Sequence, residues 1–138
     1  MFERVLVAVD GSKHSERVIS VASELAKRFG SEVLVLNVRE VVITTRSGPI
    51  GKESPEESLS LVKKVAERLV KDGVNAHGES SKTIQSGPAK EILDEARKFK
   101  ANLIVIGSHG HSELTGLLLG SVASKVLHHA ECPVTVVR

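Results

Sequence analysis

The chain has 138 residues, of which 41% are apolar and 26% charged, a balance typical of one globular domain over residues 1–138. This argues against a disordered or fibrous chain and leaves too little length for two ordinary cores. Nineteen Lys and Arg against seventeen Asp and Glu give a net charge of +2 with the signs interspersed, and the aromatic residues are three Phe without Trp or Tyr. These numbers argue against nucleic-acid binding, which uses a basic face or aromatic stacking platforms.

The apolar runs and the single cysteine indicate in which cellular compartment the protein is expected. Runs such as Val5–Val9 are far shorter than the roughly 18 residues that span a bilayer, and shorter than the apolar region of a secretory signal. We therefore expect a cytoplasmic protein with no membrane-spanning segment. The lone Cys132 cannot form an intrachain disulfide and offers no Cys-x-x-Cys motif, so it is interpreted as a small residue in a turn before Pro133.

Short apolar runs predict the strands of a parallel sheet. Four of them are rich in β-branched residues and apolar on both faces, which is typical of strands covered by helices on two sides. They are Val5–Val9, Val33–Val38, Leu103–Ile106 and Val134–Val137. A more polar strand is predicted within about Asn75–Ile84, and its polarity favours an edge position.

Helical periodicity separates these strands. The predicted helices run from about Ser15 to Phe29, from Ser54-Pro55 to Gly73, from Gly87-Pro88 onward and from about Gly120-Ser121 onward. The apolar positions at helical spacing are expected to face the core, and they include Val18, Ala22, Leu25, Phe29, Leu59, Val62, Ala66, Leu69, Ile92, Ala96, Phe99, Val122 and Val126. Strict alternation of strands and helices predicts an α/β fold with a doubly wound parallel sheet and helices on both faces. The polar segment Glu40–Lys52 is predicted to be a loop.

Two predicted strands pass into small polar turns, and these turns indicate where a ligand would bind. They are Val9-Asp10-Gly11-Ser12 and Ile106-Gly107-Ser108-His109-Gly110. In open α/β sheets, ligands bind outside the carboxyl ends of the strands, at the point where the strand order reverses. Two such turns side by side would form that crevice.

The glycines after the fourth predicted strand suit a phosphate group. They follow the spacing Gly107-x2-Gly110-x9-Gly120-Ser121. Glycines let main-chain amides approach a ligand closely, and a helix N-terminus presents unpaired N–H groups to an anion. Neither the Walker motif nor the dinucleotide fingerprint occurs. By spacing alone, the pattern fits either a phosphate cradle or ordinary turns and caps.

The same pattern resembles the nucleotide-binding motif of the universal stress protein family, in its ATP-binding branch. The resemblance extends over the chain, through Val5–Ser12, Asn37-Val38, Gly87-Pro88 and Cys132–Val137. It implies a five-stranded parallel sheet of order 3-2-1-4-5 with four helices, and ATP in the crevice between the first and fourth strands. It also implies a homodimer formed through the strand that contains Val134 and Val136.

The resemblance further implies roles for individual residues. It places the adenine against the main chain of Val38 and near Ala8, and the ribose hydroxyls near Asp10 and Gly107. The triphosphate would lie on the loop Gly110, His111 and Ser112 and on the amides of Gly120, Ser121 and Val122. His109 is also counted among the binding residues. Some relatives carry a hydroxyl or a lysine where this chain has Ala123 and His111. Because Glu113 is the one carboxylate in the segment, we expect Mg²⁺ to be carried mainly by the phosphates.

Simpler interpretations exist for several of these residues. Asp10 could merely cap the first helix. His109 and His111 are more typical of an exposed loop than of a metal pair, since no Cys or third His stands at ligand spacing. Ser108, His109 and Asp10 are not expected to form a hydrolase triad, because neighbours in a turn rarely hydrogen-bond as nucleophile and base.

These observations favour a dimeric stress-response protein that binds ATP, or else ADP or AMP, and acts as a nucleotide-dependent switch or adaptor for a protein partner. The motif holds no dedicated general base and no arginine finger, so the enzymatic alternative is slow ATP hydrolysis at most. A further alternative is a dimerisation or chaperone-like module without bound nucleotide. The identity of any nucleotide that co-purifies would separate these alternatives.

Overall fold

Strands and helices alternate along the chain in the computed structural model, which describes residues 1–46, 48–51, 53–109 and 119–138. The elements are β1 (Arg4–Ala8), α1 (Lys13–Phe29), β2 (Glu32–Thr44), β3 (Gly48–Gly51), α2 (Pro55–Lys71), β4 (Asn75–Thr83), α3 (Pro88–Phe99), β5 (Leu103–Gly107), α4 (Ser121–His129) and β6 (Val134–Val137). Within the described ranges, the four helices and the five strands expected from the sequence are all present, and β3 is an addition.

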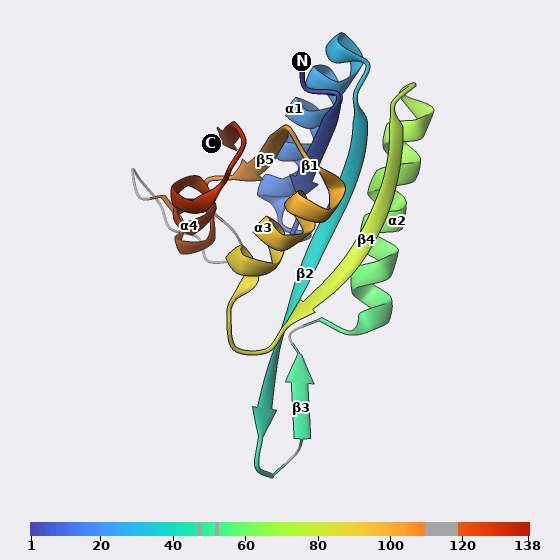
Figure 1. Ribbon diagram of the computed structural model, residues 1–138. Helices are drawn as coiled ribbons and strands as arrows, with labels where there is room; N and C mark the ends of the chain where they lie inside the picture. Colours follow the sequence, from blue (N-terminus) through green and yellow to red (C-terminus); the bar gives the residue numbers. More distant parts are fainter. Residues whose placement is uncertain (47, 52, 110–118) are drawn as a thin grey trace.

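The main sheet is parallel throughout (Figure 1). Its strands follow the order β4-β2-β1-β5-β6, which is the predicted order 3-2-1-4-5 in the numbering of the five expected strands. Val5 of β1 is paired with Val33 of β2 on one side and with Leu103 of β5 on the other. The polar strand β4 lies at one edge, as predicted, and β6 lies at the other.

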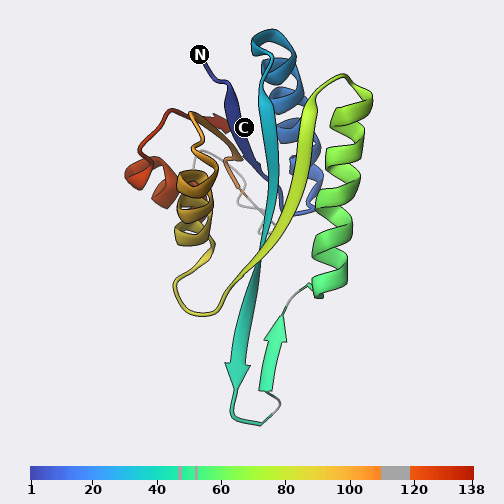
Figure 2. The same cartoon turned by 45° about the vertical axis from the view of Figure 1, so that its right-hand side comes forward.

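Helices cover both faces of this sheet, and Figure 2 shows α1 and α2 on one side and α3 and α4 on the other. The face under α1 and α2 is packed with residues such as Val7, Val35 and Leu69, each with no solvent-exposed surface. Residues such as Leu6, Ile104 and Val126 fill the opposite face. Because each strand supplies apolar side chains in both directions, the continuous apolar runs of the sequence are explained.

The helix ends lie where the sequence predicts them, while two of the residues predicted to face the core are exposed. The Ser54 side chain accepts a hydrogen bond from the N–H of Glu57 at 3.0 Å, and Gly30 closes α1 in the left-handed conformation with φ of 63°. The prediction that Phe29 and Leu59 face the core is wrong, because they are 44% and 56% exposed. Phe29 lies at the C-terminal end of its helix, where it makes an edge-to-face contact with Phe2.

The segment predicted as a loop between β2 and α2 contains a β-hairpin. β2 continues to Thr44, and β3 pairs with its end in antiparallel register, with Val42 opposite Ile50. Figures 1 and 2 show this hairpin projecting from the body of the molecule as an arm. The prediction rested on polar and turn-forming residues, which here occupy the tip, while Val41, Val42 and Ile43 carry the strand onward.

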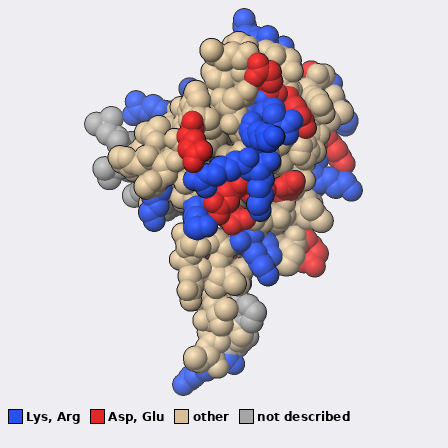
Figure 3. Space-filling view, viewed as in Figure 1, with Lys and Arg blue, Asp and Glu red and all other residues tan. Residues whose placement is uncertain are grey.

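The outer face of α3 is covered by charges of both signs (Figure 3). Asp94 pairs with Lys90 at 2.7 Å and with Arg97 at 2.9 Å, and Lys98 pairs with Glu95 at 3.1 Å. These pairs are three or four residues apart on one helix, which is the spacing at which side chains on a helix surface meet. None of the described helices is both long and apolar enough to cross a membrane.

Gly78 permits a close approach between β4 and α2, and its replacement is expected to destabilise the fold strongly. A Cβ at this position would lie 2.7 Å from the carbonyl oxygen of Val62, so the helix backbone would have to move. We expect Gly78→Val to lower the free energy of unfolding by roughly 2 to 4 kcal/mol, measured by urea unfolding. The exposed substitution Asn75→Ala on the same strand is the control, and an equal effect of both would contradict this packing.

Candidate functional site

A cleft of about 680 Å³ opens at the carboxyl ends of β1 and β5. The chain leaves β1 toward β2 on one side, while β5 lies on the other, so the strand order reverses at this point. The predicted site residues that line the cleft are Ala8, Asp10, Val38, Gly107, His109, Gly120, Ser121 and Val122. Gly110, His111 and Ser112 lie outside the described residues. The structure thus brings eight predicted positions together, and their contacts with a nucleotide remain a prediction.

Asp10 combines a cleft position with a structural role at the start of α1. Its Oδ1 accepts hydrogen bonds from the N–H of Ser12 at 2.9 Å and from the hydroxyl of Ser15 at 2.7 Å. Ser12, not Asp10, occupies the N-cap position, and its side chain makes no capping bond. The interpretation of Asp10 as the cap of the first helix is therefore wrong: its carboxylate fixes the turn before the helix, and the same carboxylate lines the cleft.

A chain of contacts connects the β5 turn to the end of β6. The Ser108 hydroxyl lies 2.9 Å from Nδ1 of His109, so these two neighbours do hydrogen-bond, although such a bond is rare within a turn. The His109 ring stacks on His14 with centroids 4.3 Å apart. Nε2 of His14 lies 2.9 Å from the carbonyl oxygen of Val137, and because a carbonyl only accepts, this nitrogen carries the proton.

This chain of contacts does not amount to a hydrolase triad. In a triad the base is oriented by a third polar group, and among the described residues no carboxylate hydrogen-bonds to His109. Ser108 is only 8% exposed. The contacts instead hold the start of the glycine segment against α1 and β6.

Two glycines at this end of the cleft lie in close packing with neighbouring segments. A Cβ on Gly107 would lie 2.8 Å from Cδ2 of His14, and a Cβ on Gly120 would lie 3.0 Å from the carbonyl oxygen of Ser108. The N–H of Gly120 also donates to that oxygen at 2.6 Å. The absence of side chains therefore lets three segments meet at the mouth of the cleft, as a close approach to a ligand also requires.

Sequence reasoning did not assign several residues that line the cleft, among them His14, Asn37, Glu40 and Glu53. His14 lies four residues after Asp10, a spacing that brings side chains together once a helix begins between them. Asn37 is the one polar residue within the apolar run of the second predicted strand, which was a usable signal. Glu40 and Glu53 flank the hairpin, so their meeting could not be expected from a loop.

Titratable groups outside the cleft do not form a competing site. Burial raises the pKa of the Cys132 thiol, which disfavours the reactive thiolate. Burial, and then the hydrogen bond with Glu95, raise the pKa of the Glu79 carboxyl on β4. The described residues contain no group of three or more His, Cys, Asp or Glu side chains that could hold a metal ion.

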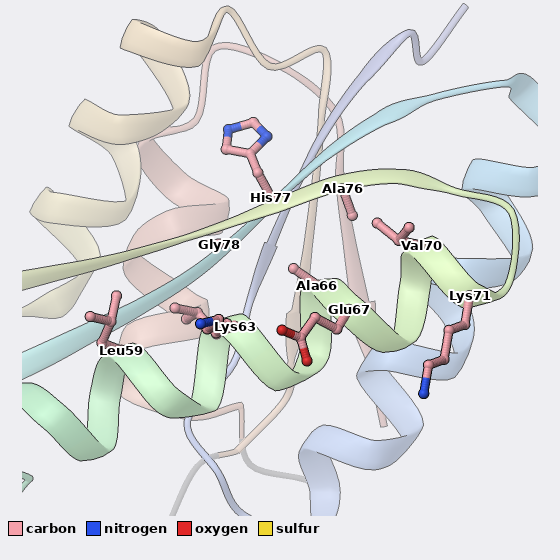
Figure 4. Close-up of a pocket in the computed structure, with 10 residues that line it drawn as sticks. Leu59, Lys63, Ala66, Glu67, Val70, Lys71, Ala76, His77 and Gly78 are labelled. Atoms are coloured by element: carbon pink, nitrogen blue, oxygen red, sulfur yellow. The ribbon is translucent and has the colours of Figure 1, made fainter.

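A second hollow of about 590 Å³ lies between α2 and β4 (Figure 4). Its floor is formed by small or apolar residues such as Ala66, Ala76 and Gly78. Figure 4 shows His77 pointing to the opposite side of β4 from α2, so its imidazole does not converge with Lys63 or Glu67. The hollow therefore lacks the convergent polar groups of a ligand site and reflects the small side chains of β4.

Comparisons with known proteins identify the family of the chain. The family model described as Universal stress protein family matches residues 1–138. The chain is 37% identical to universal stress protein YxiE of Bacillus subtilis, with all of both chains covered, and 37% identical to a universal stress protein of Thermus aquaticus, again over all of both. A solved universal stress protein from Archaeoglobus fulgidus in complex with dAMP has 29% identity and a TM-score of 0.68, covering 99% of this chain and 98% of that one.

Proposed function

Since the chain belongs to the universal stress protein family, we propose that it binds an adenine nucleotide in the cleft at the carboxyl ends of β1 and β5. One observation carries this proposal: Asp10, Val38, Gly107 and Gly120 come from four separate segments and line the same cleft. The relative from Archaeoglobus fulgidus, solved in complex with dAMP, supports a ligand of this class. We take residues 1–138 as a single cytoplasmic domain with this role.

The proposed ligand is ATP, with ADP or AMP as alternatives, and the cleft offers suitable groups along its length. The main chain of Val38 faces the base, and the Asp10 carboxylate is an acceptor for ribose hydroxyls. The phosphates lie toward the N-terminus of α4, where Ser121 and Val122 present main-chain N–H groups to an anion, while the N–H of Gly120 is bonded to the carbonyl oxygen of Ser108. Mg²⁺ would be carried by the phosphates.

We further propose that the protein is a homodimer that acts as a nucleotide-dependent switch or adaptor for a protein partner. β6 forms an edge of the sheet, yet Val134 and Val136 are only partly covered by the core beneath α3 and α4. Antiparallel pairing with β6 of a second copy would satisfy the open main-chain groups and cover these valines. Coupling between nucleotide and partner would then follow from differential binding to two states.

Asp10→Ala is expected to reduce the affinities for ATP and AMP by a similar factor, because both ligands carry the same sugar. Calorimetry with each nucleotide measures this. Asp10→Asn is the matched control for the turn, since its side-chain oxygen can still accept from Ser12 and Ser15. If the loss appeared only with the magnesium complex of ATP, Asp10 would be a metal ligand and the ribose assignment would fail.

The nucleotide that co-purifies with the protein tests the proposed function as a whole. We expect acid extraction of the purified protein to release an adenine nucleotide, identified by chromatography. An empty cleft, together with no binding of added ATP, ADP or AMP in calorimetry, would favour a dimerisation or chaperone-like module instead.

A further inference from the structure

The pairing between β1 and β2 stops at the cleft. Ala8 and Leu36 are the last partners in the parallel register, and the N–H of Val9 then donates to the carbonyl oxygen of Leu36 at 2.9 Å. In a parallel ladder, the next hydrogen bond would run from the N–H of Val38 to the carbonyl oxygen of Val9. These two described residues make no such bond, and the Val9 carbonyl instead accepts from Nδ2 of the Asn37 side chain at 2.8 Å.

This side-chain bond leaves the main chain of Val38 facing the cleft. Successive residues of a strand direct their N–H and C=O groups alternately to the two neighbouring strands. Because Leu36 bonds toward β1, Val38 points the same way, at a level where β1 has already ended. Val38 lines the cleft, and no described residue hydrogen-bonds to its main chain on that side.

Two serines hold the Asn37 side chain in its orientation. Asn37 is 1% exposed, and its Oδ1 accepts from the Ser58 hydroxyl at 2.6 Å. The hydroxyl oxygens of Ser58 and Ser80 lie 2.5 Å apart, and since the single proton of Ser58 goes to Asn37, Ser80 must donate to Ser58. If the Asn37 amide were flipped, its NH₂ group would face the Ser58 hydroxyl, which donates, and its oxygen would face the Val9 carbonyl, which accepts. The orientation of the amide is therefore fixed.

We propose that Asn37 is the positioning residue for base recognition: by occupying the Val9 carbonyl, it keeps the N–H and C=O of Val38 available to the edge of an adenine. This inference rests on the proposed nucleotide-binding function. Adenine offers an acceptor at N1 beside a donor at N6, which matches a main-chain donor and acceptor. Guanine carries a donor at N1 and an acceptor at O6, so in the same pose donor would face donor and acceptor would face acceptor.

Hydrogen exchange tests the role of Asn37 without any ligand. In the nucleotide-free protein, the Val38 amide should exchange rapidly, because it has no protein partner. In Asn37→Leu, the buried Val9 carbonyl loses its donor, and the Val38 N–H is placed to replace it by extending the ladder. We expect the Val38 amide to exchange at least about tenfold more slowly in this variant, measured by NMR. Slow exchange in the unsubstituted, nucleotide-free protein would overturn the proposal.

Base preference supplies the second test. Calorimetry should show that the ratio of ATP to GTP affinity falls by about tenfold in Asn37→Leu, which corresponds to one main-chain hydrogen bond. Ser31→Ala is the matched control, since its hydroxyl donates to the Phe2 carbonyl at 2.5 Å at the opposite end of the same strand pair. The control should lose stability and keep its base preference. Equal proportional losses for ATP and GTP in Asn37→Leu would contradict a role in base recognition.

A variant that does not fold and a protein that binds no nucleotide each need a separate measurement. If Asn37→Leu does not fold, Ser58→Ala removes only the hydroxyl that orients the amide, and a smaller change in the same ratio is expected; an unchanged ratio would count against the proposal. If the unsubstituted protein binds neither ATP nor GTP, the proposed function itself fails. The exchange rate of the Val38 amide then still decides whether Asn37 ends the ladder.

Discussion

Replacing Val136 with lysine is expected to convert the dimer into a monomer, or into insoluble protein if the monomer is not stable. Val136 is paired with Ile106 and is partly covered by the core beneath α3 and α4. In the proposed pairing of two β6 strands, the ammonium group would be buried without a partner, which costs several kcal/mol. Sedimentation velocity at micromolar concentration measures the oligomeric state.

A matched variant separates this effect from a general response to added charge. Asn75→Lys places the same group on an exposed position of β4, at the opposite edge of the sheet, and should leave the dimer intact. An unchanged dimer for Val136→Lys would refute the interface. A monomeric unsubstituted protein under the same conditions would refute the dimer itself.

Gly120→Val should weaken ATP binding by roughly 2 to 4 kcal/mol, which is about a 30- to 1,000-fold loss of affinity. A Cβ on Gly120 would lie 3.0 Å from the carbonyl oxygen of Ser108 and 3.4 Å from Cα of His109, so the turn after β5 must give way. The added branches would also occupy the approach to the N-terminus of α4. Calorimetry measures the change.

Gly73→Ala is the control for this glycine. It lies outside the cleft, and its φ of 87° makes a side chain strained, so the control should lose stability without losing affinity. Equal ATP affinity in Gly120→Val and the unsubstituted protein would remove Gly120 from the binding site.

Much of the architecture could be predicted because local and global signals agree. Continuous apolar runs such as Val33–Val38 require cover on both faces, and the alternation with helices allows few topologies. The strand order came from the family resemblance, since periodicity does not specify which strands are neighbours. The hairpin was missed because Val42 and Ile43, each 61% exposed, lie outside the core and therefore carry no burial pattern.

The site was predictable where it depends on the main chain and less so where it depends on side-chain contacts across the fold. Glycine spacing and a carboxylate after a strand single out Gly107, Gly120 and Asp10, and the family resemblance is what favours a nucleotide site over ordinary turns and caps. The roles of His14 and Asn37 depend on carbonyl groups 123 and 28 residues away in the sequence, and no local pattern encodes those partners. For Asn37, the one available signal was the presence of an amide side chain within the otherwise apolar run Val33–Val38.

The two edges of the sheet differ in how readily they can accept a further strand from another molecule. Along β4, Asn75, His77, Glu79 and Lys82 are all exposed, and charged side chains on an edge oppose the addition of another strand. Along β6, three of the four side chains are valines and none is charged. If β6 pairs with a second copy as proposed, the open β6 edges of both copies are used up and the assembly ends as a closed pair. Open fibres would need a second compatible edge, which the charged side chains of β4 oppose.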